Sequence, residues 1–277
     1  MGRLIRIAAL AAGVFAAASP ARAADPGAVE RLRSTGSCPR CDLNRADLKA
    51  MPMGGAKMEG VRLRDSDLKD AQLAGAELGG ADLRRADMDK ANLKGARLGK
   101  ANLSGATLEK AMLAEADLRG ADLRTADFEN AGLEGATLAG ADLRNADFSR
   151  ATLERASLDK ANAYQVNMKR ARLRGASLAE ANLSWSNLDR ADFTGAILRG
   201  ADLTSARLRR ADLTNADLRG AKLEDADLRL ANLTGARLDD AKGVNRERLS
   251  SACGTPASPL PDGLTLKPCV KEAGESP

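Results

Sequence analysis

The sequence predicts an all-β solenoid, a single domain in which the chain coils repeatedly around one long axis. From about Ala46 to Ala241, nearly every fifth residue is alanine, and the residue two places later is leucine, methionine or phenylalanine. An α-helix would spread such a repeat around its whole surface, and a flat strand would send successive leucines to opposite faces. The chain must therefore turn once in every repeat.

Short sides joined by right-angled corners close one coil after about four repeats, so each leucine should stack on the leucine about twenty residues later. Neighbouring coils would lie at the ordinary strand spacing of about 4.8 Å, and residues 38–242 would form about ten coils. Phe128 and Phe148 are twenty residues apart in the leucine position, so their rings are expected to stack in the core.

Several repeats carry a recognisable signature. Ala81–Arg85 reads ADLRR, Ala121–Thr125 reads ADLRT and Ala201–Ser205 reads ADLTS, so the chain resembles the pentapeptide repeat family, whose pattern is A(D/N)LXX. The resemblance covers most of the chain and implies the right-handed quadrilateral β-helix of that family. It implies less about function, because the family includes many members of unknown role and a few that protect DNA gyrase by mimicking DNA.

Residues 1–23 have the features of a cleavable signal peptide. Two arginines precede an apolar run from Ile7 to Ala18, and Ala21–Ala23 supplies a small-x-small cleavage pattern, so the mature chain should begin at about Ala24. The apolar run is too short to span a bilayer. We therefore expect a periplasmic or secreted protein without a transmembrane segment. Cleavage removes three arginines and no acid, which lowers the net charge from +5 to about +2.

Both ends of a solenoid need caps, because an open coil exposes leucines and unpaired backbone groups. Residues 24–37 are predicted to form the N-terminal cap, with Asp25 before a short helix and Gly36 after it. The repeat ends at residue 242, and residues 243–277 are predicted to form a C-terminal cap with a second helix over 245–252 and a Pro-rich tail. Two capped ends favour a monomer.

The four cysteines lie only in these end regions. About ten coils separate the ends by far more than the roughly 7 Å that a disulfide spans between Cα atoms, so the predicted pairs are Cys38 with Cys41 and Cys253 with Cys269. The same distance excludes a four-cysteine zinc site within one chain. The C-x-x-C of Cys38 and Cys41 is also the pattern of a thioredoxin-like redox pair, but its place in the first repeats favours a structural disulfide.

The sequence contains few of the features that an enzyme active site requires. The chain has no histidine, which removes the commonest general base and the usual catalytic triad. Aspartates recur directly before the leucine, where they are expected to bond nearby backbone and support the turn: Asp82, Asp122, Asp142 and Asp202. Glycines recur at the corners, where they suit a positive φ, and do not form a phosphate loop. We expect no catalytic residue, metal or cofactor.

Two departures from the repeat are candidate binding features. Tyr164 lies in the repeat Ala161–Gln165, in which Ala163 replaces leucine, and one coil later Trp185 and Ser186 interrupt the pattern. Tyr164 and Trp185 are predicted to face outward on the same side of adjacent coils. They form either a small aromatic platform for a sugar or peptide, or a local packing irregularity in which Tyr164 covers the vacated leucine site.

The second feature is a cluster of basic residues on one side of the last coils, where twenty-residue spacing brings six cations together: Lys169, Arg170, Arg190, Arg209, Arg210 and Arg229. Arg207 lies nearby, with Asp189 and Asp227 as the only obvious acids. This cluster is either a site for an anionic envelope polymer or lipid head group, or a charged face that keeps the rod in solution.

The sequence bears on three classes of function. A noncatalytic exported scaffold that presents its faces to an unknown protein or an anionic envelope component is favoured. A DNA mimic that protects gyrase would need a strongly acidic surface and access to the cytoplasm, whereas this chain is mildly basic and carries an export signal; no nucleic acid partner is expected. An enzyme is least favoured, because no acid, base and nucleophile converge in the sequence.

Overall fold

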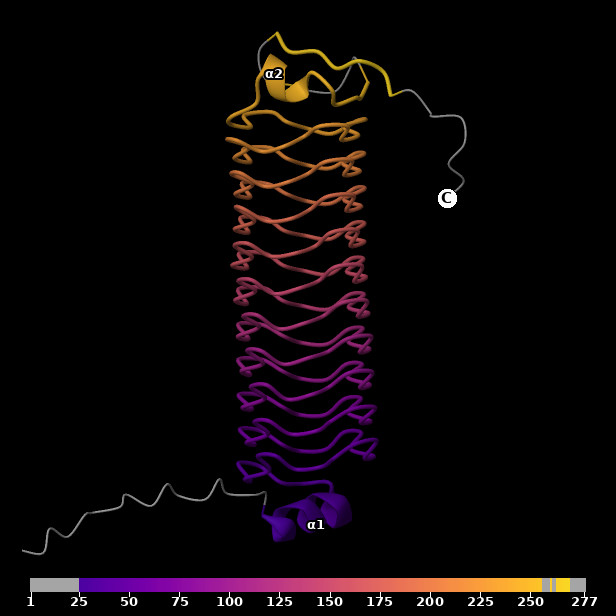
Figure 1. Cartoon of the computed structure of the whole chain (residues 1–277), viewed down its shortest axis with the longest axis vertical. Coiled ribbons are helices and arrows are strands. Elements are labelled where there is room, and N and C mark those ends of the chain that lie inside the picture. The colour runs from indigo at the N-terminus through magenta and orange to yellow at the C-terminus, as the bar shows by residue number, and fades with distance from the viewer. Residues whose placement is uncertain (1–24, 256–259, 261–262, 270–277) are drawn as a thin grey trace, which may run out of the picture.

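A computed structural model describes residues 25–255, 260 and 263–269, and in it the repeats wind into a long rod (Figure 1). Two short helices lie at the ends of the rod: α1 spans Pro26–Thr35 and α2 spans Arg246–Leu249. The predicted signal peptide, residues 1–23, and most of the Pro-rich tail lie outside the described residues. We number the places of each repeat 1 to 5, with alanine at place 1 and leucine at place 3.

The register of the coils is twenty residues. Parallel bridges join the residue at place 2 of each repeat to the residue twenty positions later, from Ser37 with Lys57 through to Lys222 with Lys242. These bridges are isolated single residues, because a corner follows each one before the extended backbone becomes a strand. The prediction of four repeats per coil is therefore confirmed, although the coil sides are shorter than regular strands.

Each repeat binds its neighbours through the same set of backbone hydrogen bonds. In the repeat at Ala81, the Leu83 N–H donates to the Asn102 carbonyl (2.7 Å), and the Arg85 N–H donates to the Ser104 carbonyl (3.1 Å). The Ala86 N–H closes the corner by donating to the Leu83 carbonyl at 3.1 Å. Place 5 has a positive φ in nearly every repeat, which together with this bond defines a type II turn.

Leucines and alanines fill the interior of the rod. Most residues at places 1 and 3 are less than 2% exposed, so the stacked leucines form one continuous core with the alanines beside each corner. The rings of Phe128 and Phe148 stack with centroids 4.5 Å apart and planes 8° apart, as predicted. Ser186 fits the alanine place because its hydroxyl donates to the Leu183 carbonyl at 2.5 Å.

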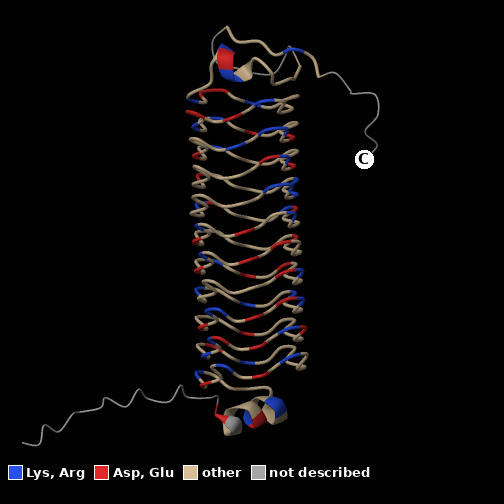
Figure 2. Cartoon of the chain, in the orientation of Figure 1, with Lys and Arg blue, Asp and Glu red and all other residues tan. Residues whose placement is uncertain are grey.

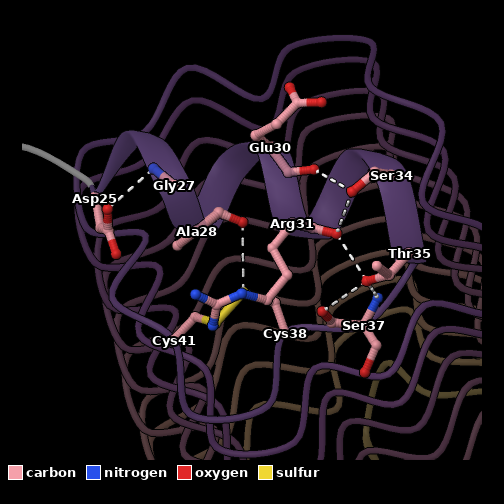
Figure 3. Close-up of a disulfide and its surroundings, with 10 residues drawn as sticks. All are labelled: Asp25, Gly27, Ala28, Glu30, Arg31, Ser34, Thr35, Ser37, Cys38 and Cys41. Atoms are coloured by element: carbon pink, nitrogen blue, oxygen red, sulfur yellow. Dashed lines mark hydrogen bonds between the residues drawn. A yellow bond between two sulfur atoms is a disulfide. The ribbon is translucent and has the colours of Figure 1, made fainter.

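The helix α1 lies at the N-terminal end of the rod. Asp25 is its N-cap and accepts a hydrogen bond from the Gly27 N–H at 3.0 Å, and Gly36 ends it in the left-handed conformation. Ala28 and Leu32 join the core of the rod. Figure 3 shows the disulfide beneath the helix, where the Cys38–Cys41 bond links Cα atoms 5.5 Å apart.

The C-terminal end begins where Gly243 takes the leucine place. A Cβ at Gly243 would lie 2.4 Å from the Glu224 backbone nitrogen, so no other residue fits without movement of the chain. The helix α2 follows, with Asn245 as its N-cap, and it is shorter than the 245–252 that the sequence suggested. The chain then continues the bridge pattern through Cys253, and the Cys253–Cys269 disulfide fastens the segment that follows.

Candidate functional site

The predicted basic cluster lines a hollow on one side of the rod near its C-terminal end. This hollow has a volume of about 700 Å³. We call it the basic groove and define it by the residues that line it: Lys169, Arg170, Asp189, Arg190, Arg207, Arg209, Arg210, Arg229, Leu230 and Ser251. Elsewhere acidic and basic residues are interspersed along the rod, as Figure 2 shows. The groove therefore concentrates one sign of charge.

Three arginines of the groove form a column along the rod. Arg170, Arg190 and Arg210 occupy place 5 in successive coils and share one backbone conformation, with φ of 60°, 60° and 56°. Each N–H donates to the carbonyl of the place 4 residue in the next coil, at 3.0, 2.9 and 3.0 Å respectively. Because the three backbones are alike and fixed, the three side chains leave the rod in parallel from one corner.

This corner uses side chains where glycine would be easier. From Ala50 to Leu230, no residue of the corner column is glycine, although every one has a positive φ. The following corner has Gly175, Gly195 and Gly235 in the coils beside the groove. A positive φ costs a residue with a Cβ about 1 kcal/mol relative to glycine. The arginines are therefore kept at this corner against a backbone preference.

A buried carboxylate forms the floor of the groove. Asp189 is 5% exposed and accepts hydrogen bonds from Arg209 Nη2 at 2.7 Å, from the Arg209 N–H at 3.1 Å and from Arg207 Nη2 at 2.8 Å. Burial alone would raise the pKa of Asp189, but the Arg209 hydrogen bonds and the charges of both arginines outweigh it and lower that pKa. Asp189 thus stays ionised and holds Arg207 and Arg209 in place.

Of the other five basic residues of the groove, one side chain is ion-paired and four are not. Arg229 makes a bidentate pair with Asp227, at 2.6 and 2.8 Å. Within the part of the chain that the structure describes, the side chains of the other four make no ion pair or hydrogen bond: Lys169, Arg170, Arg190 and Arg210. Like charges stacked in neighbouring coils repel one another, so this arrangement favours an anion between them.

The sequence analysis predicted that six of these basic residues lie together, but it did not predict three features of the groove. Leu230 continues the arginine column at its C-terminal end and is 56% exposed, and Ser251 lines the same end after the repeats have stopped. The floor role of Asp189 was also missed. The twenty-residue spacing contained the signal for Leu230 and Asp189, whereas Ser251 lies outside the repeat.

The two aromatic residues do not stack on each other in the structure. Trp185 is 60% exposed at a corner, and Tyr164 is half-buried next to the fully buried Ala163. Across the described residues, ring stacking occurs only between Phe128 and Phe148. The platform of Tyr164 and Trp185 stays a prediction.

The repeated aspartates act on the backbone. Asp82, Asp122 and Asp142 each accept a hydrogen bond from the N–H two residues later, at 3.3, 3.2 and 3.2 Å. Each also pairs with the arginine at that position, whose hydrogen bond lowers the pKa of the carboxyl. They support turns, as expected from their place in the repeat.

No group of three or more cysteine, aspartate or glutamate side chains among the described residues is arranged to hold a metal ion. No described helix is both long enough and apolar enough to cross a bilayer.

The twenty-residue register, the type II corners and the leucine core define a β-solenoid repeat protein with a surface groove. Eight overlapping matches to the model described as pentapeptide repeats together span residues 41–242. The chain belongs to the pentapeptide repeat family, whose members fold as right-handed quadrilateral β-helices. The family consists in general of non-enzymatic scaffolds.

Solved structures of the family are similar to this chain. HetL from the cyanobacterium Nostoc sp. strain PCC 7120, described as involved in heterocyst differentiation regulation, is 33% identical; the match covers 86% of this chain and 98% of HetL, with a TM-score of 0.42. Rfr23 from the cyanobacterium Cyanothece 51142 is 34% identical over 39% of this chain and 63% of its own, with a TM-score of 0.27.

QnrB1, a plasmid-mediated fluoroquinolone resistance protein, is 17% identical; the match covers 63% of this chain and 83% of QnrB1, with a TM-score of 0.33. At that identity, the likeness concerns only the fold. No curated protein matches the chain.

Proposed function

We propose that this protein is a noncatalytic, exported scaffold that binds an anionic component of the cell envelope in its basic groove. The observation that carries the proposal is the set of four cations around the groove whose side chains pair with no described residue, beside a floor where Asp189 offsets one of the two charges of Arg207 and Arg209. A charged face that served only to keep the rod in solution would alternate its signs. Such pairing of opposite charges occurs at another corner of the rod, where Arg85 at place 5 pairs with Asp65 of the preceding coil at 2.9 Å.

Export is supported by two independent features. Residues 1–23 have the charge, apolar run and cleavage pattern of a signal peptide. Both pairs of cysteines lie at disulfide distance, and such bonds persist in oxidising compartments such as the periplasm or the medium.

The proposed architecture is a monomeric rod of about ten coils that is closed at both ends. The helix α1 would shield the first coil, and α2 with the disulfide-linked segment after it would shield the last. Capping both ends would hide the unpaired backbone groups through which solenoids join end to end. The sides of the rod, including the groove, would then be its binding surfaces.

Protection of DNA gyrase by DNA mimicry is the competing function. The mild positive charge and the predicted export signal disfavour it, because a mimic needs an acidic surface and access to the cytoplasm. The likeness to QnrB1 is too distant to favour it.

The test is localisation followed by crosslinking and affinity capture in the native cell. The groove variant carries Arg170→Asn, Arg190→Asn and Arg210→Asn, because asparagine tolerates a positive φ. The control variant carries Arg45→Asn, Lys100→Asn and Arg155→Asn, which remove three charges from place 5 at other corners, where φ is also positive. We expect capture of an envelope component by the wild-type protein and the control variant but not by the groove variant. Retention in the cytoplasm, or capture of gyrase, would refute the proposal.

A further inference from the structure

We propose that the ligand of the basic groove carries two or more phosphate groups in line, which lie along the rod and contact arginines of successive coils. This inference rests on the proposed function, because it takes the groove as the binding site of the protein. It goes further by naming the chemistry of the ligand, its direction on the rod and its length.

The direction follows from the arginine column. Successive coils are one parallel-strand spacing apart, about 4.8 Å, so Arg170, Arg190 and Arg210 repeat at that interval along the axis. Their backbone hydrogen bonds to the next coil keep this interval fixed. A ligand with anionic groups about 5 Å apart can place one group against each guanidinium. A ligand wrapped around the rod would meet only one of the three.

The chemistry follows from the type and number of free cations. A guanidinium offers a planar fork of N–H donors that matches two oxygens of a phosphate. Three of the four unpaired cations are arginines, and Lys169 lies beside them as a fourth positive charge. A phosphate monoester carries about 1.5 to 2 negative charges near neutral pH. Two such groups therefore balance the four unpaired cations.

The ends of the column set the length of the ligand. On the N-terminal side the next residue of the column, Arg150, is already paired with Glu129 at 2.5 Å. On the C-terminal side the column continues with Leu230, which is uncharged and 56% exposed. The free arginines thus span three coils, or about 10 Å. A hollow of about 700 Å³ holds a small ligand of that length, and Leu230 can contact its uncharged part.

Asp189 fixes two further arginines beside the column. Arg207 and Arg209 both donate hydrogen bonds to its carboxylate, which offsets one of their two charges. The ligand would therefore lie against the outer arginines and would need no rearrangement of the floor. Asp189 acts here as a positioning residue.

The first experiment is calorimetric titration of the oxidised, purified protein with orthophosphate, pyrophosphate, tripolyphosphate and a tricarboxylate such as citrate. We expect tripolyphosphate to bind at least tenfold more tightly than either orthophosphate or citrate. The groove variant should lose at least tenfold in affinity for tripolyphosphate, whereas the control variant should lose less than threefold. Circular dichroism of both variants checks that the rod is intact.

A third variant distinguishes the effect of guanidinium geometry from the effect of positive charge. It carries Arg170→Lys, Arg190→Lys and Arg210→Lys, which keep the three charges and lose the guanidinium geometry. We expect it to bind tripolyphosphate several-fold more weakly than the wild-type protein. Where tripolyphosphate binds, equal affinity of the wild-type protein and the lysine variant, or equal affinity for citrate and tripolyphosphate, would overturn the inference.

The second experiment identifies the source of the phosphates. Phosphatidylcholine vesicles containing cardiolipin, which has two linked phosphates, are compared with vesicles containing phosphatidylglycerol at the same total charge. Groove-dependent binding to cardiolipin vesicles alone assigns the phosphates to a lipid head group, and groove-dependent binding of tripolyphosphate alone assigns them to a free oligophosphate.

Absence of groove-dependent phosphate binding in both experiments would overturn the inference. If the groove nevertheless captured a carboxylate-rich envelope component, the proposed function would stand without it.

Discussion

The stacked pair Phe128 and Phe148 provides the sharpest test of the twenty-residue register. Both side chains are fully buried, and their rings are 4.5 Å apart and nearly parallel. The perturbation is Phe128→Leu, Phe148→Leu and the double variant, since leucine is the usual residue at place 3. Each single change should cost about 1 to 2 kcal/mol through lost volume and contact.

The decisive quantity is the coupling energy between the two changes. An aromatic pair contributes about 0.5 to 1.5 kcal/mol beyond the area that it buries. The double variant should therefore be destabilised by about 1 kcal/mol less than the sum of the single changes. The assay is urea unfolding followed by circular dichroism, with coincidence of a second probe to check two-state behaviour.

Phe193 supplies the matched control. It is fully buried at place 3 of a different coil side and stacks on no other ring of the described chain. The pair Phe148→Leu and Phe193→Leu should be additive to within about 0.5 kcal/mol. Additivity of the Phe128 and Phe148 changes as well would mean that the rings are not neighbours, and the register would be wrong.

Three further predictions concern stability. Gly243→Ala should cost more than about 2 kcal/mol in a urea titration, because its Cβ would meet the backbone of Glu224 in the preceding coil; Gly195→Ala, with a similar φ and open space around its Cβ, should cost about 1 kcal/mol, and equal costs would contradict the clash. Opening the Cys253–Cys269 disulfide, which closes a loop of sixteen residues, should cost about 3 kcal/mol, and hydrogen exchange should show the loss in residues 246–255; protection unchanged there would argue against it. Acid should destabilise the rod, because hydrogen bonds from Arg219 and Arg199 hold the pKa of Asp217 well below its ordinary value. The contribution of Asp217 to the free energy of unfolding is therefore complete above about pH 4 and is lost as the pH falls further. Asp217→Asn should flatten the dependence of stability on pH, and an unchanged dependence would refute this role of Asp217.

The core of the rod could be predicted from the sequence because one local rule decides it. Each leucine at place 3 must be inside, and a corner must follow it, so the period alone gives the register that the bridges show. The stacking of Phe128 on Phe148 and the turn-supporting role of Asp122 followed from the same rule.

The groove could be predicted only in part, because pairing between long side chains is not periodic. Spacing placed Arg209 and Arg190 on one side of the rod, but it did not show that Asp189 engages the first and leaves the second free. That difference depends on a single residue at place 4 being aspartate in one coil. Ser251, which also lines the groove, lies after the last repeat, so the twenty-residue spacing could not predict its position.

The fixed register has an evolutionary consequence. A duplication of twenty residues anywhere in the rod adds one whole coil and leaves every column of side chains along the rod aligned. A duplication of five keeps the leucines inside but rotates everything downstream by one side, so an insertion after Arg190 would carry Arg210 around to another edge. Rods of this kind can therefore change their length freely in units of twenty, whereas any shorter change redraws the pattern of charges that they present.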